Sequence, residues 1–326
     1  MTSLLHIRCG SDLRDGLKAA DIKGDFLEYA DPVCRGGTPA TNDTHIFRQA
    51  RLDYLVGELG EDAQGTNAKL DAAEAGLASV DGYEHIVLWF EHDIYDQSVL
   101  IRLLDQFEQR PDLHDRLHMI TLDRFPGVAR FNGLGQLSPD QLASLWGTQM
   151  PVTQAQRQLG VAAWRAFRSE DPGDLVAMAG RNDLALPYLA GALRRHLQDL
   201  PWTRDGLSLT QRLTLQAIHE GAQTPGKCFG ALVNRLEPQP FLGDLMYWPI
   251  LAGLAQAGEP AITPVEDWQS PVALTPFGKR LLDGDADWLA RNGIKCHHGG
   301  LQLATPDAVW RWDGVEGCLS TRSNHT

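Results

Sequence analysis

The chain opens with apolar runs that are interrupted by turn-forming residues, and this pattern predicts strands and helices in alternation. Residues 4–9 are apolar and compatible with a strand, and Gly10-Ser11-Asp12 interrupts them before a short helix over residues 13–20. A second strand is expected over residues 25–30. The stretch over residues 35–39 that follows contains too many Gly and Pro residues for regular structure, so we expect a loop there.

Helical spacing of apolar residues resumes from Phe47 to Leu59, and a further helix over residues 69–77 precedes the clearest strand, residues 85–90. A helix over residues 99–107 and a fourth strand over residues 117–122 come next. Strands that alternate with helices indicate an α/β fold with a three-layer, mostly parallel sheet. We therefore assign residues 1–130 to a Rossmann-like or flavodoxin-like domain.

The pattern after residue 130 is helical. Ser138-Pro139 and Thr153 are typical of helix N-termini, and Pro187 opens another helix. We expect no strand between Phe131 and Trp202, so residues 131–203 form a helical connecting region.

The last part of the chain has the element order of a winged helix. Helices are expected over residues 208–220, near Leu232 and over residues 245–257, followed by short strands over residues 261–265 and 272–275 and a closing helix. Residues 204–326 are therefore predicted to be a winged-helix-like C-terminal domain.

Three blocks together resemble the bacterial family called domain of unknown function 1835: residues 6–12 (HIRCGSD), 88–97 (LWFEHDIYDQ) and 133–137 (GLGQL). Further similar stretches are residues 186–189, 192–197, 206–208 and 310–313. The resemblance covers nearly the whole chain, and residues 88–97 are its most specific part. It implies the same domain layout, but the family is uncharacterised and implies no chemistry.

Composition places the chain among globular proteins, because 43% of its residues are hydrophobic and 22% are charged. No stretch is long and apolar enough to span a bilayer, and the N-terminus lacks the pattern of a signal peptide. These features predict a soluble, cytoplasmic protein. The five cysteines form no CxxC pair, which favours reduced thiols.

Charge argues against nucleic acid as a partner. The formal net charge is -13, and residues 205–284 contain five lysines or arginines and eight aspartates or glutamates, a net charge of -3. The third predicted helix also lacks the side chains that read base edges over residues 245–252. A small anionic ligand or a protein partner is therefore favoured, and a transcription regulator is the least favoured of three hypotheses.

Acidic residues follow every predicted strand of the α/β domain: Asp12 follows the first, Asp31 the second, Glu91, Asp93 and Asp96 the third, and Asp123 the fourth. Open parallel sheets bind ligands beyond the carboxyl ends of their strands, where carboxylates such as Asp12 and Asp93 would hold Mg²⁺ and arginines would hold a phosphate. Glu91, His92 and Asp93 are the candidate catalytic residues for hydrolysis or group transfer, with His92 as a general base. The candidate ligand-binding residues are Gly10, Ser11, Asp12, Arg35, Arg48, Arg51 and Asp96.

The alternative is structural, and we weigh it as the more common case. Asp93 or Asp96 would cap the following helix, Asp12 would do the same, and His92 would pack. The chain would then be a non-enzymatic regulatory or interaction protein. No GxGxxG, P-loop or GxSxG motif is present, Gly133-Leu134-Gly135 is assigned to packing, and zinc at Cys296-His297-His298 is disfavoured because adjacent histidines usually point apart.

Overall fold

A five-stranded sheet organises the N-terminal half of the computed structural model, which describes residues 3–304 and 309–321. Its strands are β1 (Leu4–Arg8), β2 (Asp25–Glu28), β4 (His85–Glu91), β5 (Leu117–Leu122) and β6 (Met150–Pro151). The order is β2-β1-β4-β5-β6, with only β6 antiparallel to its neighbour. This confirms the predicted mostly parallel α/β sheet. Since β2 and β4 lie on opposite sides of β1, the strand order reverses between β1 and β4.

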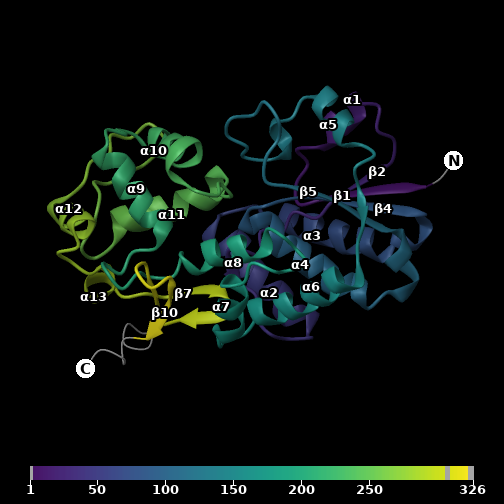
Figure 1. Ribbon diagram of the computed structural model, residues 1–326. Helices are drawn as coiled ribbons and strands as arrows, with labels where there is room; N and C mark the ends of the chain where they lie inside the picture. Colours follow the sequence, from purple (N-terminus) through teal and green to yellow (C-terminus); the bar gives the residue numbers. More distant parts are fainter. Residues whose placement is uncertain (1–2, 305–308, 322–326) are drawn as a thin grey trace.

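Helices follow the strands as the alternation of patterns predicts (Figure 1). They are α1 (Arg14–Ala19), α2 (Thr44–Leu52), the π-helical η1 (Asp53–Glu58), α3 (Ala63–Ala78), η2 (Val80–Gly82), α4 (Ile94–Glu108) and η3 (Pro111–Arg116). Asp43, Asp62 and Asp93 cap α2, α3 and α4 through side-chain oxygens. Strand β4 is a continuous apolar run because its residues 86–90 are buried on both faces of the sheet.

The connecting region is helical apart from one short strand. Its elements are η4 (Leu134–Gln136), α5 (Pro139–Leu145), α6 (Gln154–Phe167), α7 (Gly173–Ala179) and α8 (Leu189–Leu197). Helix α6 packs closely on α4, since a Cβ atom at Gly160 would lie 2.4 Å from Leu104 Cβ. The expectation of no strand in this region is wrong, because β6 pairs with His118 and Met119 of β5. Two residues are too few to show the alternation that identifies a strand.

A lobe of helices follows, drawn in green in Figure 1. It contains α9 (Leu209–His219), α10 (Pro225–Ala231), the π-helical η5 (Leu232–Leu236), α11 (Asp244–Gln256), α12 (Pro276–Asp283) and α13 (Trp288–Asn292). The two strands expected over residues 261–265 and 272–275 are wrong as strands: one bridge, between Ile262 and Leu274, joins these segments. Pro264 and Pro271 lack the N–H groups that a longer ladder needs. The winged helix itself stays a prediction.

The end of the chain returns to the α/β domain. Strand β7 (Cys296–Gly299) pairs with β8 (Leu301–Leu303) and, in parallel, with β3 (Gly36–Gly37), while β9 (Trp310–Asp313) pairs with β10 (Cys318–Thr321). The prediction that residues 35–39 form only a loop is therefore wrong for Gly36 and Gly37, which form β3. Gly36 has a φ of +71°, and a Cβ atom there would lie 2.5 Å from Tyr54. Only glycine fits this position without strain.

Candidate functional site

Three segments that are far apart in the sequence meet where the strand order reverses. They are the loop after β1, the junction of β4 with α4, and η4. The backbone N–H of Leu134 donates to Glu91 Oε1 over 2.6 Å, and a Cβ atom at Gly135 would lie 2.8 Å from Asp12 Oδ2. We call this group of residues the switch-point cluster: Arg8, Cys9, Asp12, Glu91, Asp93, Asp96 and η4.

Arg8 lies at the centre of the switch-point cluster. Only 5% of this residue is exposed, and its guanidinium forms ion pairs with Glu91 and Asp96. A third pair joins Arg8 Nε to Asp12 Oδ1 over 3.2 Å. Because the carboxylates already face a cation from the same chain, they are not free to receive a ligand's cation or hydrogen-bond donors.

The remaining polar contacts in the cluster are structural. Asp93 Oδ1 accepts hydrogen bonds from the backbone N–H groups of Tyr95 (2.8 Å) and Asp96 (3.1 Å), so it caps α4. Asp96 does not cap the helix. Its Oδ1 accepts from the backbone N–H of Glu91, and its Oδ2 accepts from the Cys9 thiol over 3.0 Å. Asp12 does not cap α1 either, since that helix has no side-chain cap.

The charge balance in the cluster favours bound protons. Burial raises the pKa values of Glu91 and Asp93 well above their usual range, and the nearby Asp96 charge adds to both shifts. Glu91, Asp93 and Asp96 each offer one oxygen within 4.8 Å of the others, so they form the one metal-ligating group found among the described residues. Asp12 is not part of it. Arg8 opposes a second cation at this place by charge repulsion.

His92 lies outside the Arg8 network. Its ring packs against Phe131 and Tyr188, with centroid distances of 6.3 and 6.4 Å, and its Nδ1 is buried with no hydrogen-bond partner among the described residues. Burial lowers the pKa of His92, which keeps the ring neutral. This arrangement favours packing over general-base catalysis. Of the two loop residues, Gly10 is half-buried and Ser11 is exposed, and the Ser11 carbonyl accepts from the Arg14 backbone N–H.

The three arginines predicted to hold a phosphate lie apart from the switch-point cluster. Arg35 pairs with Asp199. Arg48 pairs with Asp71 over 2.9 Å, and Arg51 pairs with Asp31 over 2.8 Å. The structure therefore does not bring them together with Glu91 or Asp93. The reason is that each arginine forms an ion pair with a carboxylate that lies next to it in the folded chain.

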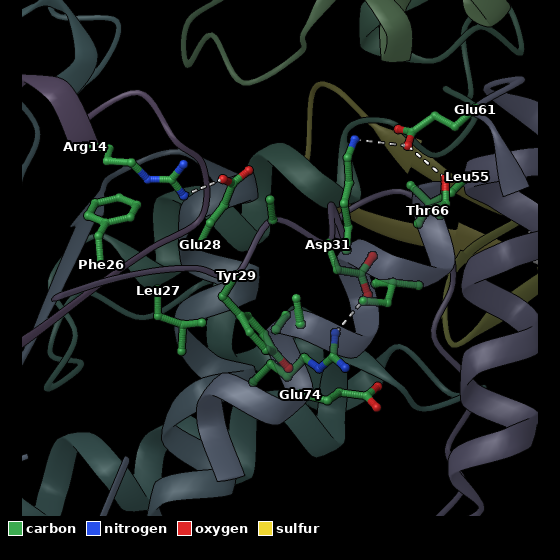
Figure 2. Close-up of a pocket in the computed structure, with 16 residues that line it drawn as sticks. Arg14, Phe26, Leu27, Glu28, Tyr29, Asp31, Leu55, Glu61, Thr66 and Glu74 are labelled. Carbon is green, nitrogen blue, oxygen red and sulfur yellow. Dashed lines mark hydrogen bonds and ion pairs between the residues drawn. The ribbon is translucent and has the colours of Figure 1, made fainter. Parts of the chain in front are cut away.

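A cavity of about 360 Å³ opens at the carboxyl end of β2, beside α3 (Figure 2). We call it the β2-end cavity. Its lining residues are Arg14, Phe26, Leu27, Glu28, Tyr29, Ala30, Asp31, Leu55, Glu61, Thr66, Lys69, Leu70, Ala72, Ala73, Glu74 and Arg102. Asp12, Glu91 and Asp93 do not line this cavity.

Buried ion pairs form the floor of the β2-end cavity, and ion pairs with exposed cations lie at its rim. On the floor, Asp31 joins Arg102 over 2.8 Å and also joins Arg51. At the rim, Arg14 pairs with Glu28 over 3.1 Å, and their side chains are 51% and 35% exposed. Lys69, with a side chain that is 77% exposed, lies 3.8 Å from Glu61.

Sequence reasoning identified Asp31 as a strand-end residue but missed the rest of this cavity. Arg14, Lys69 and Arg102 lie on three separate helices and share no motif. The one available signal was Asp31, at the carboxyl end of an edge strand. Which helices turn their side chains toward that end depends on packing that the sequence does not display.

No family model matches the chain, and no curated protein is similar to it. The resemblance to domain of unknown function 1835 therefore stays a prediction. In the described part of the chain, no helix is long and apolar enough to cross a membrane.

Proposed function

We propose that the α/β domain binds an anionic or phosphate-bearing small molecule in the β2-end cavity. The observation that carries this proposal is a cavity of about 360 Å³ at a strand's carboxyl end, with two accessible cations at its rim. Open α/β sheets bind ligands at the carboxyl ends of their strands, and cavities of this size accommodate small molecules.

The rim supports binding of an anion because its two cations are exposed, while their carboxylate partners are half-buried. Ion pairs near the surface contribute about 0 to 1 kcal/mol, so Arg14 and Lys69 can turn from Glu28 and Glu61 toward a ligand's anionic group. An uncharged part of the ligand would lie against Leu27 on one side of the cavity. The buried pair of Arg102 and Asp31 would stay in place beneath it.

Metal-assisted hydrolysis or group transfer remains a separate prediction. Glu91, Asp93 and Asp96 supply the oxygen ligands that Mg²⁺ prefers, whereas Arg8 competes for the same carboxylates. If Mg²⁺ binds there, it displaces protons from Glu91 and Asp93, so its affinity rises with pH. Magnesium titration of the chain and of Asp93→Asn at two pH values tests this prediction.

Thermal unfolding in the presence of a ligand panel tests the main proposal. The panel contains nucleotides, sugar phosphates and organic acids, because a compound that binds the native state raises the unfolding temperature. Arg14→Gln should abolish the shift. Arg181→Gln is the matched control, since Arg181 forms a similarly exposed pair with Asp183 and lies outside the cavity. Equal shifts in both variants, or no shift from any compound, would contradict the proposal.

A protein-interaction role has less support. The large apolar side chains that are exposed in the described residues are Ile46, Met150, Leu245 and Val315, which come from four separate segments of the chain. Interaction sites usually present one contiguous apolar patch. A transcription regulator has less support still, because the charge count is unfavourable and residues of α11 line an internal cleft.

A further inference from the structure

A second cavity lies between the α/β domain and the helical lobe. Its volume is about 650 Å³, and we call it the interdomain cleft. Its walls come from the loop before β3, from η1, from α11 and from residues 288–298. Ligand sites occur preferentially at domain interfaces, and this volume is within their usual range.

Helix α11 supplies an apolar wall. Met246, Pro249 and Ile250 line the cleft together with Gly253, which leaves room beside the helix. A Cβ atom added at Gly253 would meet no atom within 4 Å. This wall has the surface that an apolar ligand body needs, and it includes no charged side chain from α11.

The opposite wall is polar. Arg35 is one of its cations and is held by Asp199, which also lies 3.0 Å from Arg195. Lys295 is exposed and has no carboxylate within ion-pair distance in the described residues. Glu58 lies on the same wall, and burial raises the pKa of its carboxyl.

We propose that the interdomain cleft binds a small amphipathic anion. Its acidic group lies near Lys295 and Arg35, and its apolar body lies along Ile250 and Gly253 of α11. This site is separate from the β2-end cavity, and no residue lines both.

Fluorescence titration with anilinonaphthalene sulfonate, an amphipathic anion, tests the site in the full chain. Gly253→Leu places a side chain in the cleft at a position where its Cβ atom meets no neighbour, and it should weaken binding by about tenfold or more, a loss of about 1.4 kcal/mol. Gly230→Leu in α10 is the matched control, since it is also a helical glycine with open space around it and does not line the cleft. Equal affinities in the two variants would overturn the proposal.

A second pair of variants tests the acidic group. Lys295→Gln should weaken binding of the sulfonate several-fold and leave binding of the uncharged probe phenylnaphthylamine unchanged. Lys227→Gln, an exposed lysine outside the cleft, should alter neither. Unchanged sulfonate affinity in Lys295→Gln would overturn the assignment of the anion to this wall. Because Arg14→Gln does not touch the cleft, failure of this proposal is distinguishable from failure at the β2-end cavity.

Discussion

Polar side chains from distant segments meet in both the switch-point cluster and the interdomain cleft. The two regions differ in whether those side chains contact other residues or line a cavity. At the switch point, Arg8 pairs with the carboxylates and η4 covers them. In the cleft, which has a volume of about 650 Å³, Lys295 has no carboxylate within ion-pair distance in the described residues, whereas Arg35 on the same wall is paired with Asp199. Titratable residues that converge therefore do not by themselves define a ligand site. Whether the chain supplies their counter-ions is the informative feature.

Changes in pH also affect the stability that the two regions contribute in opposite directions. Glu91 and Asp93 have raised pKa values, so the stability they contribute is present at low pH and is lost as pH rises through those values. At the edge of the cleft, burial lowers the pKa of His298 from 6.5 to about 4. Its contribution is present above pH 6.5 and is lost as pH falls toward 4.

Replacing Arg8 should give the largest effect. Arg8→Met leaves Glu91 and Asp96 buried without their cation, and breaking buried ion pairs in this way costs about 3 to 5 kcal/mol. Urea unfolding measures the change. Arg124→Met is the control, since Arg124 is exposed and should alter stability by no more than about 0.5 kcal/mol. A similarly small effect of Arg8→Met would mean that the cluster is not a structural network.

His298 should give the next largest effect, at acidic pH. Lowering its pKa from 6.5 to about 4 corresponds to about 3 kcal/mol of unfolding free energy, which the native chain loses across that range. His298→Gln cannot take up the proton, and its amide retains a donor for the His196 carbonyl that His298 Nε2 contacts over 2.9 Å. Unfolding measured at several pH values should therefore be less acid-sensitive in the variant. If its acid sensitivity matches that of His45→Gln, an exposed control, His298 is not the cause.

Asp93→Asn should have a smaller effect on the free energy of unfolding. Its pH dependence should be opposite to that of His298→Gln. Asparagine keeps the cap of α4 but carries no charge, so the variant should gain on the order of 1 kcal/mol at neutral pH. The gain should disappear at acidic pH, where Asp93 itself is protonated. Unfolding at both pH values measures the difference. A loss of stability at neutral pH would show that the Asp93 carboxylate is charged and needed.

Filling the cleft should have the smallest effect on stability. Gly253→Leu replaces an unstrained helical glycine that has open space beside it, and such changes stabilise by about 0.5 to 1 kcal/mol. Thermal unfolding measures the gain. Destabilisation would indicate that the cleft is packed more tightly than its volume suggests.

The sequence predicted the parallel sheet well because each element carried a local signal. The apolar run of β4, the helical spacing of α4 and the capping residues Ser138 and Thr153 all depend on neighbours within a few positions. Strand β3 carried no such signal, since it consists of two glycines that pair with a segment near the other end of the chain.

The candidate site was predicted only in part, for a related reason. The convergence of Asp12 with residues 91–96 was expected from strand order, and these residues do meet around Arg8. That residues 133–137 cover them was not predicted, since Gly133-Leu134-Gly135 was assigned to packing. The role of Arg8 was not predicted. Arg8 lies within an apolar run, and no local sequence pattern indicates that it is the counter-ion of the carboxylates. The two cavities depend on how helices from separate segments pack, which local patterns do not encode.

Calorimetric titration distinguishes a ligand site at the β2-end cavity from one at the switch-point cluster, which we interpret as a closed structural network. The anionic compound that gives the largest thermal shift would be titrated into the unaltered chain, Arg14→Gln and Asp93→Asn. We expect Arg14→Gln to weaken binding by about tenfold and Asp93→Asn to leave it unchanged. Loss of binding in Asp93→Asn, with normal affinity in Arg14→Gln, would contradict this expectation. It would instead place the ligand site at the carboxyl ends of β1 and β4.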